Sequence, residues 1–310
     1  MHRVSAAAFA GTLSVLSACS TTQEPVTTAP ANRAILQPTG PAVTTESAAL
    51  RTHYARVQRA LLDQELLRTD GGGPDTPYTA AMLARNFKKI ALYEEFAGGN
   101  MNAGEAVSTL HRWEDPVRIS LEFGGAITPE ARRADRRAVD TYIARLRRAT
   151  GHPIISVGPS AANFHVFVVD EPARRAIGPR LRNIIPTITS GTIDAVVNLR
   201  RSSYCLVFAW DPEKDGSYTK AVAVIRAEHP DLLRLSCIHE EIAQGLGLAN
   251  DSPHARPSVF NDDEEFGLLT RHDEDLLGIL YDRRLRPGMA PEEAMPIVRQ
   301  IVQERMAKAR

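Results

Sequence analysis

The sequence predicts an α+β fold, in which a mixed β-sheet precedes a helical C-terminal part. Between residues 117 and 226, segments of strand length recur along the chain, and only one long helical pattern interrupts them. After residue 231 the apolar residues follow a helical period over 231–248, 270–281 and about 291–306. This single change from strand-like to helical spacing favours the α+β class.

The first predicted element is a helix over residues 48–67, which ends before the glycines at 71–73. Residues 90–96 fit either a short helix or a strand. Residues 117–123 alternate strictly between apolar and polar side chains, which predicts a half-buried strand. A helix then starts after Thr128 and stops at Gly151. Further strands are predicted at 154–157, 164–169, 193–199, 204–210 and 221–226.

Composition excludes several function classes. The chain of 310 residues has 37 basic and 37 acidic side chains, so it is not a broadly cationic nucleic-acid binder, and no nucleic-acid partner is expected. Three cysteines are too few for a cysteine-rich scaffold or a four-cysteine zinc site.

The N-terminus predicts export. A short basic start precedes the apolar residues 4–18, which suit a signal peptide and are too few to span a bilayer. The run Leu16-Ser17-Ala18-Cys19 resembles the lipobox of bacterial lipoproteins, which implies that Cys19 is lipidated and anchors the chain to the membrane. Ser20, where an aspartate would retain such a protein in the inner membrane, implies the outer membrane. The alternative is an ordinary secretory signal cleaved near Ala18.

The predicted organisation is a signal peptide over 1–18, a disordered tether over 19–46, a helix and linker over 47–76, and an α+β domain over 77–310. A tether on the periplasmic face places the domain where disulfides are permitted. With Cys19 lipidated, Cys205 and Cys237 remain, and we expect them to pair. Two buried thiols are the alternative.

The segment from Cys237 to Tyr281 carries the most information about function. His239-Glu240 begins the zinc motif HExxH, but residue 243 is alanine, so the motif itself is absent. On a helical projection the apolar stripe lies opposite Glu240 and Gln244, which are four residues apart. His239 lies beside the stripe and is expected to be structural.

Shifted by one residue, the segment reads Glu240-Glu241-x-x-Gln244-x-x-Gly247-x-x-Asn250. This spacing resembles HExxHxxGxxH of the metzincin-type zincin metallopeptidases, with all three metal histidines replaced. The general-base position, Glu241, and the turn glycine, Gly247, are retained. Downstream, Ser258-Val259-Phe260 resembles the Ser-x-Met turn of those enzymes. The resemblance implies a zincin-like sheet with the motif on a following helix.

A second resemblance covers more of the chain. The run HEEIAQGLGLANDS, the segments SVFNDDEEF and LLTRHDEDLLGILYDRRLRPGM, and the upstream RWEDPVRISLEFG are similar to the bacterial family called domain of unknown function 2927. The similarity extends over about residues 80–290. It implies no particular chemistry.

Two functions follow from the altered motif. In the first, the domain is a non-catalytic binding or assembly factor that contacts an envelope protein or peptidoglycan. In the second, it is a metal-dependent hydrolase of envelope peptides or peptidoglycan stems, with Glu241 as base. Its metal, zinc or a harder divalent cation, would then use oxygen-rich ligands. The candidate ligands are Glu240, Gln244, Asn250 and Asp251.

Overall fold

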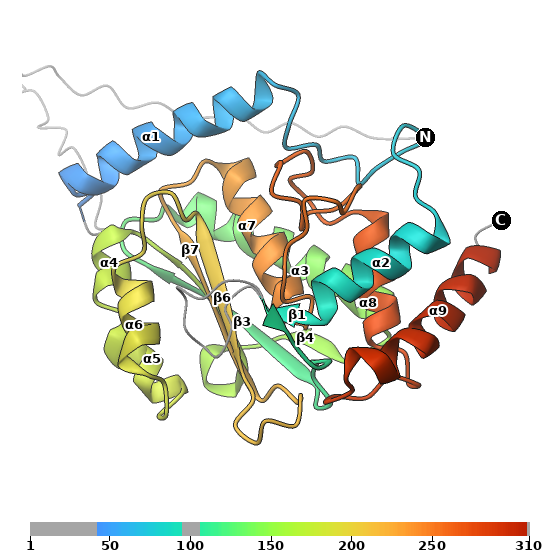
Figure 1. Ribbon diagram of the computed structural model, residues 1–310. Coiled ribbons are helices and arrows are strands. Elements are labelled where there is room, and N and C mark those ends of the chain that lie inside the picture. The colour runs from blue at the N-terminus through green and yellow to red at the C-terminus, as the bar shows by residue number, and fades with distance from the viewer. Residues whose placement is uncertain (1–41, 95–105, 309–310) are drawn as a thin grey trace, which may run out of the picture. The chain divides into compact units, whose positions relative to one another are not determined.

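The computed structural model describes residues 42–94 and 106–308, and Gly40–Arg310 form one compact unit (Figure 1). The predicted signal peptide, Cys19 and nearly all of the tether lie outside the described residues. Within them, no helix combines the length and the apolar character needed to cross a bilayer.

A five-stranded mixed sheet forms the centre of the unit, with the strand order β4-β3-β5-β7-β6. Four strands are parallel, and β6 at one edge runs antiparallel to β7. The strands are β3 (Val117–Gly124), β4 (Ile154–Ser156), β5 (Phe164–Val169), β6 (Cys205–Trp210) and β7 (Lys220–Arg226). This mixed sheet with surrounding helices confirms the predicted α+β class.

One face of the sheet packs against the larger helices. The apolar side chains of this layer form the main core, which includes Phe164, Ile238 and Leu276. Strand β5 is buried along its whole length, and its sequence is apolar apart from His165 because a strand covered on both faces needs no polar side. The helices are α2 (Ala80–Ala91), α3 (Pro129–Thr150), α7 (Asp231–Gln244), α8 (Arg271–Leu280) and α9 (Pro291–Lys308).

The opposite face carries three short helices, α4 (Glu171–Arg175), α5 (Gly178–Ile184) and α6 (Ser190–Val197) (Figure 1). Helix α6 corrects the predicted strand at 193–199, which was wrong. Thr189 caps the helix by accepting a hydrogen bond from Thr192 N, and Ile193 and Val196 are buried three residues apart. The β-branched residues therefore lie on one buried face of a helix. Taken without the capping residue Thr189, the same residues resemble a strand.

Helix α1 (Thr45–Leu62) packs on the same unit. Tyr54 is fully buried, and its hydroxyl donates to Arg201 O at 2.9 Å. Gln58 Oε1 accepts a hydrogen bond from Leu233 N at the start of α7 (3.0 Å). These contacts hold one side of α1, which includes the buried Ser47 and Tyr54, against the rest of the unit.

Smaller elements complete the unit. Helix α2 ends at Ala91, and β1 (Tyr93–Glu94) pairs antiparallel with β2 (Ala106–Val107), so the ambiguous segment at 90–96 contributes to both a helix and a strand. A 3-10 turn, η2 (Pro159–Ala161), lies between β4 and β5. Helix α3 begins and ends as predicted, with Thr128 as N-cap and Gly151 in the left-handed region at φ 67°.

Candidate functional site

The altered motif lies on α7, which packs on β6 and β7. Most of this helix is buried on all sides, and Glu240 is its only half-buried residue between Ser236 and Gln244. The chain leaves the helix at Gly245, where an added Cβ would lie 2.4 Å from the Phe164 ring. The carbonyl of Gly245 accepts a hydrogen bond from Trp113 Nε1 at 2.8 Å. The end of the motif helix is therefore closely packed against the sheet.

A disulfide joins Cys205, the first residue of β6, to Cys237 in α7, with the Sγ atoms 2.02 Å apart. The predicted pairing is confirmed. The bond fixes the edge strand to the motif helix. It also places Cys237 Sγ 3.8 Å from His229 Nδ1, at the turn between β7 and α7.

Beside the disulfide are the two adjacent carboxylates of the motif. Within residues 42–94 and 106–308, the one group of three metal-ligand side chains is Cys205, Glu240 and Glu241, whose ligand atoms lie within 4.8 Å of one another. The Cys205 sulfur is already bonded to Cys237, so it is not a thiolate. The group therefore provides two carboxylates for a cation.

The two amide positions of the motif are engaged in the protein's own hydrogen bonds. Gln244 Nε2 donates to Asp251 Oδ1 at 3.0 Å. Asn250 is buried, and its Nδ2 donates to Lys89 O at 3.1 Å, near the end of α2. The Asn250 backbone N–H donates to Ile90 O at 3.1 Å. Asn250 thus holds the loop after α7 against α2.

The retained glycine has a clear structural reason. Gly247 has φ 121°, and an added Cβ would lie 2.2 Å from the carbonyl oxygen of His111. Only glycine tolerates both the left-handed backbone and this close approach. The turn that follows α7 therefore depends on Gly247.

The segment Ser258-Val259-Phe260 is hydrogen-bonded to the start of α8. Ser258 Oγ donates to Asp273 Oδ1 at 2.5 Å, and Val259 N donates to Asp273 Oδ2 at 3.0 Å. Phe260 is fully buried. Asp273 also completes the capping box with Thr270 at the start of α8. Burial raises the pKa of Asp273, but hydrogen bonds from His272, Ser258 and Val259 N outweigh this effect and hold the pKa below its usual value.

The histidines near the motif have structural surroundings. His239 stacks on Tyr142 with ring centroids 3.8 Å apart, and its Nδ1 accepts a hydrogen bond from Leu269 N. Burial lowers the pKa of His239 to about 3. His272 is fully buried and contacts Asn86 at 3.0 Å, whereas His254 is exposed.

The residues at the altered motif do not fit zinc. Zinc sites draw three or four ligands from cysteine, histidine, aspartate and glutamate. Here Glu240 and Glu241 supply carboxylates, while the positions of the second and third histidines hold neutral amides with donors directed at Asp251 and Lys89 O. An amide oxygen is a weak ligand for zinc and suits harder cations better.

A cluster that sequence reasoning missed lies on the other face of the sheet. Ser120 on β3 and His165 on β5 are register partners, and Glu122 lies two residues along β3. However, Ser120 Oγ (3.2 Å) and Glu122 Oε1 (2.7 Å) both contact His165 Nδ1. A catalytic triad needs the hydroxyl and the acid on opposite ring nitrogens. The arrangement is therefore a hydrogen-bonded cluster without triad geometry.

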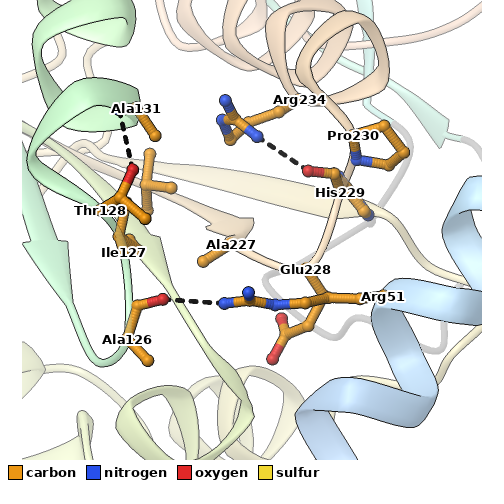
Figure 2. A pocket seen from close by; sticks show the side chains of 11 residues that line it. Arg51, Ala126, Ile127, Thr128, Ala131, Ala227, Glu228, His229, Pro230 and Arg234 are labelled. Atoms are coloured by element: carbon orange, nitrogen blue, oxygen red, sulfur yellow. Dashed lines mark hydrogen bonds between the residues drawn. The ribbon is translucent and has the colours of Figure 1, made fainter. Parts of the chain in front are cut away.

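A cavity of about 280 Å³ opens at the carboxyl ends of β5 and β7, beside α1 (Figure 2). Charged and polar side chains from α1, α7 and the end of β7 line it together with apolar residues. Arg51 extends from α1, and its Nη2 donates to Ala126 O at 2.8 Å (Figure 2). The lining residues include Arg51, Ile127, Thr128, Glu228, His229 and Arg234.

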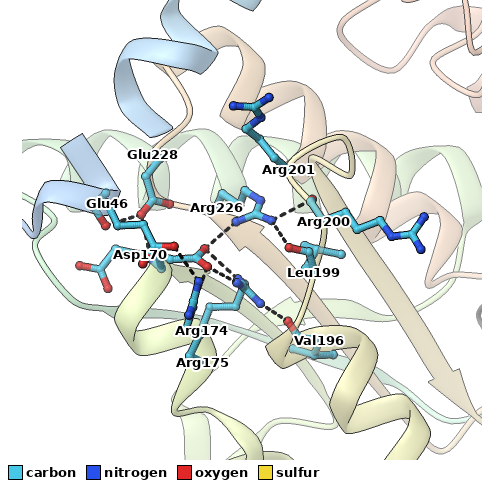
Figure 3. A network of polar contacts seen from close by, with 12 residues as sticks. Glu46, Asp170, Arg174, Arg175, Val196, Leu199, Arg200, Arg201, Arg226 and Glu228 are labelled. Atoms are coloured by element: carbon cyan, nitrogen blue, oxygen red, sulfur yellow. Dashed lines mark hydrogen bonds and ion pairs between the residues drawn. The ribbon is translucent and has the colours of Figure 1, made fainter. Parts of the chain in front are cut away.

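A buried ionic network supports one side of this cavity (Figure 3). Glu171 at the start of α4 binds Arg226 (2.8 Å) and Arg174, which are both 1% exposed. A second buried glutamate, Glu228, lies beside it. Glu228 Oε1 accepts hydrogen bonds from the Glu171 backbone N–H (2.7 Å) and from Ser47 Oγ (2.6 Å). Arg174 and Arg226 thus both pair with the buried Glu171, as buried charges usually do, while Glu228 accepts hydrogen bonds from uncharged donors.

Sequence reasoning did not find this cavity, although a signal exists. Glu228 and His229 come directly after a strand that ends at Arg226, and the carboxyl ends of parallel strands are where open α/β sheets place ligands. Arg51 was not detectable in this way, because nothing local to α1 indicates which surface it covers.

The comparisons with known proteins agree with the similarity seen in the sequence. A family model described as "Protein of unknown function (DUF2927)" matches residues 80–300. Neither the curated proteins nor the solved structures contain a match to the chain. The matched segment holds the whole sheet, the motif helix and most of α9, so the chain belongs to the DUF2927 family of proteins of unknown function.

Proposed function

We propose that this chain is a lipid-anchored envelope protein whose domain is a zincin-like scaffold that binds a partner without catalysis. The observation that carries the proposal is the set of bonds that residues at and beside the altered motif make within the protein. Cys205 is in a disulfide, Gln244 bonds Asp251, and Asn250 bonds Lys89 O. Gln244 and Asn250, at the positions of two metal histidines, thus bond within the protein, and the Cys205 sulfur beside Glu240 and Glu241 is not a thiolate.

The scaffold part of the proposal is supported by topology. An antiparallel edge strand, β6, precedes the last parallel strand, β7, and the motif helix α7 follows at once. The close approach at Gly247 and the hydrogen bond from Phe260 N to Ser258 Oγ support the same reading. These features suit a zincin-like domain whose catalytic positions have been replaced.

The location in the envelope rests on the sequence before the domain. Leu16-Ser17-Ala18-Cys19 provides the lipidation signal, and Ser20 favours the periplasmic face of the outer membrane. A disulfide in the domain fits an oxidising compartment. The expected partners are an envelope protein or peptidoglycan, together with the membrane through the lipid on Cys19.

Metal content and hydrolysis of peptides together test the proposal. The chain, purified without chelator and then offered zinc, is expected to hold well below one metal per chain by mass spectrometry. It is also expected not to cleave a library of peptides or peptidoglycan stems. Glu240→Ala and Glu241→Gln are compared with Glu130→Gln, an exposed glutamate on α3.

One equivalent of metal that Glu240→Ala removes, with hydrolysis that Glu241→Gln abolishes and Glu130→Gln leaves intact, would refute the proposal. The metal-dependent hydrolase would then be the function. The anchor is tested separately by labelling cells with a fatty-acid analogue. Label should enter the wild-type chain and not Cys19→Ser; equal labelling of both would exclude lipidation at Cys19.

A further inference from the structure

Three residues that line the cavity beside α1 each have a buried polar atom without a hydrogen-bond partner among the described residues. The atoms are Arg51 Nε, Glu228 Oε2 and His229 Nε2. Glu228 and His229 are 2% and 3% exposed. Since buried polar groups in proteins are nearly always hydrogen-bonded, three such atoms around one cavity indicate a place for a ligand.

Two of these atoms need a donor. Glu228 Oε1 accepts from Ser47 and from the Glu171 N–H, so Oε2 is the carboxylate oxygen that remains. Burial lowers the pKa of His229 to about 3, so its ring is neutral. Its Nδ1 lies 3.8 Å from the disulfide sulfur of Cys237, which can only accept, so the ring proton is on Nδ1 and Nε2 is an acceptor. A primary ammonium group carries three donors and suits this pair of acceptors.

The third atom needs an acceptor. Arg51 Nη2 is bonded to Ala126 O, while the Nε–H is not bonded. No carboxylate of the described residues pairs with Arg51, whereas Arg234, the other arginine of the cavity, is paired with Asp135 at 3.0 Å. A ligand carboxylate would supply both the acceptor and the missing negative charge.

The N-termini of two helices also lie at the cavity and add positive electrostatic potential there. Thr128 and Pro230 are the N-cap residues of α3 and α7, and both line the cavity. Helix N-termini favour negative charge nearby. The cavity thus combines a region for a carboxylate, formed by Arg51 and these helix ends, with two acceptors for an ammonium.

We propose that this cavity binds a free α-amino acid, whose ammonium meets Glu228 and His229 and whose carboxylate meets Arg51. The volume of about 280 Å³ lies below the usual range of drug-sized sites and suits a ligand of this size. The apolar wall formed by Ile127, Val168 and Ala227 favours an aliphatic side chain. The inference goes beyond the proposed function and holds whether or not the altered motif is catalytic.

Titration calorimetry on the purified chain tests the proposal with L-valine and two analogues that each lack one charge. L-valine should bind with a Kd below about 1 mM. Isobutylamine, without the carboxylate, and isovalerate, without the ammonium, should bind at least about tenfold more weakly. D-valine and the dipeptide Val-Val distinguish a free L-amino acid from a D-amino acid or a peptide.

Three variants locate the binding. Glu228→Gln keeps an oxygen for Ser47 and the Glu171 N–H but replaces the second acceptor, and it should weaken L-valine binding at least about tenfold. Arg51→Met should have a similar effect. Arg56→Met, on an exposed position of the same helix, should leave the affinity unchanged. Circular dichroism establishes that each variant is folded.

The proposal is overturned if neither L-valine nor any related amino acid binds below about 50 mM, in which case water alone satisfies these atoms. It is also overturned if isovalerate binds as tightly as L-valine, which would make the cavity a simple anion site. Equal weakening by Arg51→Met and Arg56→Met would place binding elsewhere. If Glu228→Gln does not fold, the analogue series and the Arg51 variant still decide the question.

Discussion

The altered motif on α7 and the cavity beside α1 lie at opposite ends of the same helix. The amides of the motif and the polar side chains of the cavity differ in their hydrogen bonding. At the motif, amides that replace metal ligands bond to the protein, as Gln244 does to Asp251. At the cavity, Arg51, Glu228 and His229 each keep an atom without a partner among the described residues. The two amides of the motif thus support the fold, whereas the cavity retains groups that can bind a ligand.

The largest effect that tests this contrast is expected at the motif, from Gly247→Ala. The alanine would force a side chain into a φ of 121° and against the carbonyl of His111, so we expect a loss of about 3–5 kcal/mol in the free energy of unfolding. Urea denaturation measures it. Gly158→Ala, where an added Cβ meets nothing within 4 Å, should change stability by less than about 0.5 kcal/mol. Equal effects at both glycines would mean that the turn is not constrained.

The disulfide lies between the two regions, and its removal is the next largest effect. The cysteines are 32 residues apart, so the Cys205→Ala/Cys237→Ala variant should lose about 3 kcal/mol of unfolding free energy. Urea denaturation of the wild-type chain with and without reductant gives an independent value. A loss below about 1 kcal/mol would show that β6 and α7 hold together without the bond.

Acid should destabilise both regions through their buried histidines. Burial lowers the pKa of His229 and of His239 to about 3 in the folded chain, against 6.5 in the unfolded chain. The unfolded chain therefore takes up protons first, and the stabilisation is complete above about pH 6.5 and is lost as the pH falls toward 3.

Between pH 7 and pH 5, each histidine should account for a loss of about 2 kcal/mol, which denaturation at the two pH values measures. His239→Phe and His229→Phe should each reduce that loss. With L-valine bound, only the contribution of His229 should change. A pH dependence that neither variant alters would show that other groups cause it.

The smallest expected changes in stability come from one substitution in each region, and they compare the two regions directly. Asn250→Ala leaves the buried contact to Lys89 O unmade and should lower the free energy of unfolding by about 1–3 kcal/mol. Arg51→Met removes a half-buried guanidinium with one bond to Ala126 O, and the loss should be below about 1 kcal/mol. Thermal unfolding separates the two variants. If Arg51→Met is the more destabilising, Arg51 serves stability and the contrast between the regions fails.

Most of the sheet was predictable from the sequence because its strands carry strong local patterns. The alternation at Val117–Gly124 and the apolar run at Phe164–Val169 gave strands close to those observed. The capping residues Thr128 and Thr270 gave correct helix starts for the same reason, since a cap is a contact within four residues. The pairing of Cys205 with Cys237 followed from counting cysteines in a chain whose N-terminus predicts export.

What the sequence did not reveal depends on contacts between distant segments. The helix at Ser190–Val197 was missed because β-branched residues favour a strand by propensity, and burial against the sheet decides otherwise. The bond from Asn250 to Lys89 O spans 161 residues, and the bond from Ser47 to Glu228 spans 181. No local pattern predicts such partners. The motif residues were therefore identified, but whether they serve a ligand or the fold was not.

The position of α1 has a consequence for how members of this family diverge. The family match begins at residue 80, whereas α1, which supplies Arg51 to the cavity and bonds Glu228 through Ser47, ends at Leu62. One wall of the cavity thus comes from a segment that the family does not define. Substitutions in α1 can alter what the cavity accepts while the sheet and its core stay unchanged. Chains of the family that differ in this segment would then differ in the cavity while they share the matched domain.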